Sequence, residues 1–255
     1  MLDYLNWKAF RNDPSRFDFG VPAHSLRASL QADAEKFLTS EYASPLVLHH
    51  EAKSLGIQAL LLRFATLWHG AKPDAKRILT GLIEFSLFEL GFLPVIELSL
   101  IWSGIAHEYV APFFSPITGR SAKMLKEIRR MAYDMTHLWL MEQTARLSRF
   151  GSFFIPHFVS IDARWHELLR LNPVRSMLID DTRKSILFAR AHEADFQLVC
   201  NECESERVRA GRSLERIAAK RAAASSIDVE SMQKLVAAEE RIWRKRSKRP
   251  RAPSR

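Results

Sequence analysis

Apolar residues recur at helical spacing along most of the chain. Between residues 121 and 149 they fall every three or four positions, as on one face of an α-helix: Met124, Leu125, Ile128, Met131, Leu138, Met141 and Leu147. Another helix is predicted to begin at Pro45, because Ser44 is a good N-cap and proline is favoured at the first helical position. This helix should run to about His69. Helices therefore dominate the predicted secondary structure.

Residues 77–111 form a very apolar stretch. Acidic residues, a glycine and a proline interrupt it, so its uncharged runs are shorter than the roughly 18 to 20 residues that a membrane span needs. We therefore predict buried helices here and no stable membrane insertion. A membrane-associated helical protein built on this stretch is the alternative.

Short apolar segments between the helices are predicted to be β-strands: YVAPFF (109–114), FFIPHFVS (153–160) and FQLVC (196–200). Helices that alternate with short strands are typical of an α/β fold with a small parallel sheet. In such sheets, ligands bind beyond the carboxyl ends of the strands. Asp162 follows one of these strands, so we expect its carboxylate at a ligand site. The alternative role for Asp162 is a helix cap.

Positive charge is concentrated towards the C-terminus. The net charge is +9, and residues 204–255 contain 15 Lys and Arg against 7 Asp and Glu. We divide the chain into a domain of residues 1–203, with a helical insertion around 70–111, and a charged, helical, partly disordered tail of residues 204–255. A basic tail attracts polyanions, either nucleic acid or anionic lipid, or simply aids solubility.

The cysteine content indicates a reducing environment. The sequence has two cysteines, which give no disulfide framework, and no secretory signal peptide is visible, so a cytoplasmic location is expected. Cys200 and Cys203 form a CxxC pair without a second pair at zinc spacing, so no zinc site is predicted.

Four acidic residues lie in short motifs along the chain. Asp3 lies in MLDYLN, Glu51 in SPLVLHHEA, Asp134 in AYDMTHL and Asp162 in FVSID. Asp134 falls on the apolar stripe of the helix predicted for residues 121–149, where a carboxylate is costly unless it is paired. Each of the other three acids has an alternative reading as a solvated or helix-capping residue.

In this order, the four motifs resemble those of the PIN-domain nuclease family. The resemblance covers roughly residues 1–170. It implies a helix-rich α/β fold with a small parallel sheet of PIN-like type, followed here by a helical, basic C-terminal extension. The family's first strand should precede Asp3, where only Met1 and Leu2 stand, so we expect that the strand is missing or that the chain starts late. The helical insertion accounts for the long spacing between Glu51 and Asp134.

The resemblance implies a metal-dependent endoribonuclease that hydrolyses RNA phosphodiesters. Mg²⁺ or Mn²⁺ prefers carboxylate oxygens, and a bound metal activates water and stabilises charge in the transition state. The implied catalytic residues are Glu51, Asp134 and Asp162, and the implied metal ligands are Asp3, Glu51, Asp134 and Asp162. RNA is the expected partner, and a homo-oligomer or an inhibitory protein partner is also considered.

A cluster of basic residues lies just before Asp134 in the sequence: Arg120, Lys123, Lys126, Arg129 and Arg130. Such residues guide a phosphate backbone towards acids, or they lie on a solvated helix face. The alternative function comes from another class. It is a non-catalytic helical nucleic-acid-binding or scaffold protein that uses the basic tail.

Overall fold

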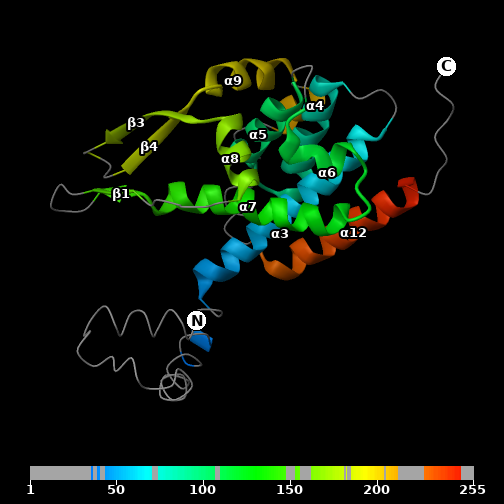
Figure 1. Ribbon diagram of the computed structural model, residues 1–255, viewed down its shortest axis with the longest axis horizontal. Coiled ribbons are helices and arrows are strands. Elements are labelled where there is room, and N and C mark those ends of the chain that lie inside the picture. The colour runs from blue at the N-terminus through cyan, green and yellow to red at the C-terminus, as the bar shows by residue number, and fades with distance from the viewer. Residues whose placement is uncertain are drawn as a thin grey trace. The chain divides into compact units, whose positions relative to one another are not determined.

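The computed structural model describes most of the chain between residues 44 and 247 (Figure 1). The described residues are 36, 39–40, 44–70, 74–106, 110–147, 153–155, 162–180, 182, 185–203, 205–211 and 227–247. The chain divides into two compact units, residues 1–49 and residues 50–255. The account below concerns the second unit, together with the start of the helix that leads into it.

Helix α3 (Pro45–Trp68) begins at the residue that the sequence predicts. The hydroxyl oxygen of Ser44 accepts a hydrogen bond from the backbone N–H of Val47 at 3.3 Å, which caps the helix. Between Ala52 and Thr66 most side chains of α3 are buried, on nearly all sides of the helix. A helix that is apolar all round belongs in the middle of a core.

The apolar stretch forms buried helices, as the sequence predicts. Helix α4 (Ala75–Phe85) continues into a π-helical turn, η2 (Ser86–Leu90), and helix α5 (Val95–Ile105) follows. Gly91, with φ 78°, makes the left-handed turn after η2, a conformation that glycine adopts without strain. Among the described residues, no helix is long and apolar enough to cross a membrane.

A compact aromatic corner follows α5. It contains the 3₁₀ turn η3 (Pro112–Phe114) and the short helix α6 (Ser115–Thr118). Phe113 and Phe114 are buried here and meet edge to face, with ring centroids 5.1 Å apart. The strand predicted for YVAPFF is therefore wrong for its described residues, because these rings pack from a 3₁₀ turn.

Helix α7 (Met124–Thr144) confirms the predicted apolar stripe, although it is shorter than predicted at both ends. Its buried face packs into the core through Met124, Ile128, Met131, Ala132, Met135, Thr136 and Leu138. Strand β1 (Arg146–Leu147) follows α7 and pairs antiparallel with β2 (Phe153–Phe154). The rest of the predicted FFIPHFVS strand, apart from Ile155, lies outside the described residues.

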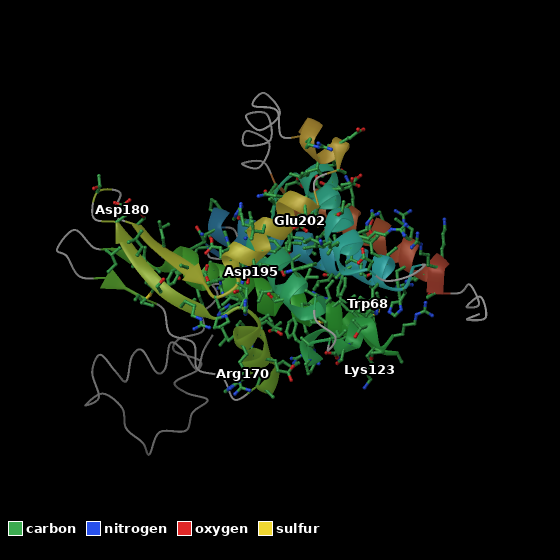
Figure 2. All side chains as sticks on the ribbon, turned by 90° about the horizontal axis from the view of Figure 1, so that it is seen from above. Trp68, Lys123, Arg170, Asp180, Asp195 and Glu202 are labelled. Atoms are coloured by element: carbon green, nitrogen blue, oxygen red, sulfur yellow. The ribbon has the colours of Figure 1, made fainter. Side chains whose placement is uncertain are left out.

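Helix α8 (Ala163–Leu171) leads into a β-hairpin, β3 (Val174–Asp180) and β4 (Ser185–Arg190). The two strands pair antiparallel, and Figure 2 shows Asp180 at the tip of the hairpin, away from the helices. Helices α9 (Glu193–Glu202), α10 (Glu206–Gly211) and α12 (Val229–Ser247) complete the described elements.

The predicted parallel sheet is wrong. Both strand pairs in the described part of the chain are antiparallel and two-stranded. The segment FQLVC, which we predicted to be a strand, lies inside helix α9. Short apolar runs fit a buried strand and a buried helix equally well, so the pattern alone misassigned this segment. The α/β fold of PIN-like type is replaced by a helix-rich structure with a projecting hairpin.

Helix α12 packs alongside α3, and the two helices run in the same direction (Figure 1). A Cβ placed on Gly56 would lie 3.4 Å from the Sδ atom of Met232. Two turns further along both helices, a guanidinium nitrogen of Arg63 lies 2.7 Å from the Glu239 carboxylate. Near the end of both helices, Arg246 donates a hydrogen bond to a backbone oxygen of α3 at 3.0 Å.

Candidate functional site

The acids predicted to form the site are only partly brought together. Asp134 on α7 and Asp162 at the start of α8 lie close enough to interact electrostatically. Glu51 lies half-buried on α3. Asp3 lies outside the described residues. The described part of the chain contains no group of three or more His, Cys, Asp or Glu side chains that could hold a metal ion.

A guanidinium group lies among the acids of α7 and α8. Arg164 donates to the carboxylate of Asp162 at 3.1 Å and to that of Glu127 at 3.3 Å. It also interacts electrostatically with Asp134. Arg164 thus supplies the positive charge that a divalent cation would supply at a carboxylate site. The described acids do not fit such a cation. Binding of Mg²⁺ or Mn²⁺ stays a prediction.

The two aspartates have opposite environments. Burial raises the pKa of Asp134, and Arg164 and Arg130 only partly offset this effect. One carboxylate oxygen of Asp134 is buried without a hydrogen-bond partner in the described structure. The hydrogen bonds from Arg164 lower the pKa of Asp162, whose side chain is 42% exposed. The carboxylate of Asp134 is therefore destabilised by burial, whereas that of Asp162 is stabilised by hydrogen bonds.

Asp162 acts as the N-cap of α8. Its carboxylate accepts a hydrogen bond from the backbone N–H of Arg164 at 2.9 Å, as well as from the side chain of the same residue. The helix-cap role that the sequence left open for Asp162 is confirmed. An N-cap carboxylate also interacts favourably with the positive end of the helix dipole.

A second candidate site consists of basic residues. We call it the basic surface, and it combines the start of α7 with the end of α12: Arg120, Lys123, Lys126, Arg129, Arg130, Arg241, Arg244, Lys245 and Arg246. Except for the half-buried Arg120, all of these residues are exposed. The same two segments, 120–130 and 240–246, contain two carboxylates, Glu127 and Glu240.

Trp243 of α12 is the point where the two segments meet. The guanidinium carbon of Arg120 lies 6.0 Å from the centroid of its ring, and the His69 ring lies 5.4 Å away. His69 in turn contacts the backbone oxygen of Ile117 through Nε2 at 2.7 Å. In Figure 2, Lys123 and Trp68 lie at this end, opposite Asp180 at the hairpin tip. The end of α3, the turn before α7 and the last turns of α12 therefore adjoin.

Arg120 has an unusual backbone conformation, with φ 53°. A non-glycine residue in the left-handed region is uncommon and costs free energy, roughly 1 to 3 kcal/mol where the surroundings enforce it. The Nε atom of Arg120 is buried and has no hydrogen-bond partner in the described part of the chain. The turn therefore holds a positive charge beside Trp243 at a cost to the backbone.

Two buried ion pairs were not predicted from the sequence. Lys53 of α3 lies 3.6 Å from Glu97 of α5, and its Nζ lies 3.4 Å from the centroid of the Trp139 ring. Burial lowers the pKa of Lys53 to about 8, although Glu97 acts in the opposite direction. Near them, Arg190 of β4 pairs with Glu142 at the end of α7. The available signal was a lone charge inside an apolar helical run, as at Lys53 and Glu97.

Comparison of the chain with protein-family models, with curated proteins and with solved structures gives no match. The resemblance to PIN-domain nucleases therefore stays a prediction.

Proposed function

We propose that this chain is a non-catalytic, helical RNA-binding protein whose basic surface binds the phosphate backbone. The observation that carries the proposal is the meeting of two basic helix ends at Trp243. Together these ends contain nine Lys and Arg residues and two carboxylates. A surface of this charge attracts polyanions over long distances. Binding is favoured further because Lys and Arg displace the counterions condensed on the nucleic acid.

The position of the cations on α7 supports a binding role. A helix N-terminus is the positive end of the helix dipole, so cations there lower helix stability. Lys123 nevertheless occupies the N-cap of α7, without a side-chain capping hydrogen bond, and Lys126 lies in the first turn. The backbone N–H groups of Lys123 and Met124 are occupied, because they donate to the side-chain and backbone oxygens of Ser121 at 3.2 and 3.0 Å. The cations therefore carry the preference for a phosphate ligand.

The cations on α12 have a second explanation that α7 lacks. Arg244, Lys245 and Arg246 lie in the last turn of α12, where positive charge interacts favourably with the helix dipole. Helix stability alone accounts for these three residues. It does not account for Lys123 and Lys126. We therefore assign the α7 cations the larger part in binding.

The environment of the acids supports binding over catalysis. The guanidinium group of Arg164 lies among Glu127, Asp134 and Asp162, where the nuclease hypothesis requires a divalent cation. An Arg side chain keeps its charge at any physiological pH, so it competes permanently with a metal for these carboxylates.

A charge-reversal experiment tests the proposal. Fluorescence anisotropy with a labelled single-stranded RNA would compare wild type, Lys126→Glu/Arg129→Glu and the control Arg170→Glu/Lys234→Glu. The control changes the same number of charges at exposed positions outside the basic surface. We expect the first variant to bind RNA at least about tenfold more weakly and the control to change affinity much less. Equal losses in both variants, or binding to phosphatidylserine vesicles without binding to RNA, would overturn the proposal.

A cleavage assay tests the non-catalytic part. The same RNA would be incubated with wild type and Mn²⁺, with wild type and EDTA, and with Asp134→Asn and Mn²⁺. We expect no metal-dependent cleavage by the folded protein. Cleavage that is lost both with EDTA and in Asp134→Asn would establish the nuclease hypothesis in its place.

A further inference from the structure

A cavity of about 240 Å³ lies between α5, the end of α7, strand β4 and the start of α9. Its lining includes two carboxylates, a guanidinium group, side-chain amides and two phenylalanines, of which the argument uses Glu142, Gln143, Phe188, Arg190, Glu193 and Phe196. This mixture of apolar walls and a few converging polar groups is typical of a small-molecule site.

Arg190 is the central polar group of the cavity. Its side chain is only 7% exposed and pairs with the carboxylate of Glu142. Another guanidinium nitrogen donates to the backbone oxygen of Asn172 at 2.5 Å. The Nε atom is buried and has no hydrogen-bond partner in the described structure. A buried N–H without a partner costs free energy, so this guanidinium group is incompletely hydrogen-bonded beside the cavity.

Hydrogen bonds hold this part of the cavity in place before any ligand binds. Asn172 is 1% exposed, and its amide nitrogen donates to Ser99 of α5 at 3.0 Å. Its amide oxygen accepts from the backbone N–H of His192 at 3.2 Å, at the start of α9. One side chain therefore ties α5 to the segment between β4 and α9. A site that is ordered in advance loses less entropy when it binds.

The charge of the lining disfavours anionic ligands. Glu142 and Glu193 supply two carboxylates and Arg190 one cation. Lys53 interacts electrostatically with Glu142 from the core side, but it is already paired with Glu97. A ligand in the cavity therefore meets an excess of negative charge. An anionic ligand is disfavoured, and a neutral ligand with both hydrogen-bond donors and acceptors is favoured.

We propose that this cavity binds the base of a nucleoside. The edge of a nucleobase presents acceptors beside donors, and its donors suit the carboxylates of Glu142 and Glu193. The Gln143 amide can pair with either kind of group. Phe188 and Phe196 provide apolar surface for the faces of the ring. The volume of about 240 Å³ is below the roughly 300 to 1,000 Å³ of pockets for drug-sized ligands, which suits a ligand as small as a base.

The proposal does not depend on the basic surface. Glu142 and Gln143 lie at the C-terminal end of α7, and Lys123 and Lys126 lie at its N-terminal end. A helix of this length spans about 30 Å. In Figure 2, Asp195 of α9, near the cavity, lies well apart from Lys123. A change in the cavity should therefore leave RNA binding at the basic surface unaffected.

Calorimetric titration with adenosine, guanosine, cytidine and uridine tests the proposal on the full chain. The blocking variant is Val95→Trp, because Val95 lines the cavity and is 48% exposed, so a larger side chain can fill the opening without disturbing the core. The matched control is Leu93→Trp, which is 40% exposed and does not line the cavity.

We expect at least one nucleoside to bind wild type saturably. Val95→Trp should weaken its binding by about tenfold or more, and Leu93→Trp should not. The nucleoside should also bind more tightly than its 5′-monophosphate, because the phosphate would meet the excess of carboxylates. RNA affinity should be equal in wild type and Val95→Trp. Failure of all four nucleosides to bind, or equal binding by Val95→Trp, would overturn the proposal.

Discussion

At the scale of single residues, the most informative position is Asp134. The sequence placed a carboxylate on the apolar stripe of a helix and predicted that it must be paired. In the structure Asp134 interacts electrostatically with Arg164, but it is half-buried and one of its carboxylate oxygens has no hydrogen-bond partner among the described residues. Burial outweighs the nearby positive charge, so the pKa of Asp134 is raised. A group like this makes stability depend on pH.

Asp134→Asn should make the protein more stable relative to wild type as the pH rises. Because the folded-state pKa of Asp134 is raised, the native state holds more protons than the unfolded state just above the ordinary aspartate pKa, about 3.9. Wild type therefore loses this contribution as the pH rises through that window, and the amide does not titrate. Urea unfolding at pH 4 and pH 7 measures the difference. A stability difference that does not change with pH would contradict this account of Asp134.

Lys53→Met should destabilise the protein by about 3 to 5 kcal/mol, because it leaves the Glu97 charge buried without its partner. The double variant Lys53→Met/Glu97→Leu should recover most of this loss, since two apolar side chains replace the pair. The free energy of unfolding in urea for both variants is the measurement. A double variant as unstable as the single one would show that the pair does not act as a unit.

Gly104→Ala should destabilise the protein by about 1 to 3 kcal/mol through overpacking. A Cβ at this position would lie 2.5 Å from the ring of Phe114, which is fully buried in the aromatic corner. Gly91→Ala is unsuitable as a control because its φ is left-handed. Ser103→Ala, at the neighbouring half-buried position, serves instead. Thermal unfolding of both variants checks the prediction, and equal melting temperatures would contradict it.

At the scale of elements, local signals in the sequence predicted the helices well. Ser44 and Pro45 located the start of α3, and the apolar stripe located α7. The strands were mostly wrong, because a short apolar run carries no period that separates a strand from one turn of a buried helix. The hairpin β3–β4 was missed because residues 174–190 gave no clear pattern, and its strands expose large apolar side chains such as Leu178 and Leu187.

The candidate site was predictable only in part. The order of the acids suggested that Asp134 and Asp162 meet, and the two do interact electrostatically. Arg164 was not considered, although it lies two positions after Asp162. Its role depends on how α8 approaches α7, and no local pattern encodes that approach. The same holds for α12, whose contacts with α3 join residues 176 positions apart in the chain.

Trp243→Ala should destabilise the protein by about 3 kcal/mol, because a nearly buried indole is removed from the contact of α12 with His69. Ile242→Ala, at a 37% exposed position on the same helix, should have a much smaller effect. Because Trp243 joins the two halves of the basic surface, its loss should also weaken RNA binding. Unfolding curves and RNA anisotropy on the same samples test both effects. If Trp243→Ala is destabilised but binds RNA with the affinity of wild type, α12 is not part of the binding surface.

At the scale of the whole molecule, the fold brings two basic segments of the chain together. From the sequence, residues 120–130 were expected to surround the acids, and the basic C-terminal residues to form a separate tail. In the structure the start of α7 and the end of α12 adjoin at Trp243. The acids beside them already have a guanidinium partner in Arg164. The electrostatics of the molecule therefore favour holding a polyanion over cleaving it.

The most direct test of this claim is the salt dependence of RNA affinity. The logarithm of the binding constant should fall linearly with the logarithm of the salt concentration, by about 0.7 for each phosphate contact with a single strand. Lys126→Glu/Arg129→Glu should make the wild-type slope shallower by about 1.4 or more, and Arg170→Glu/Lys234→Glu should leave it unchanged. A wild-type affinity that does not depend on salt, or a slope that the basic-surface variant does not change, would contradict the proposed function.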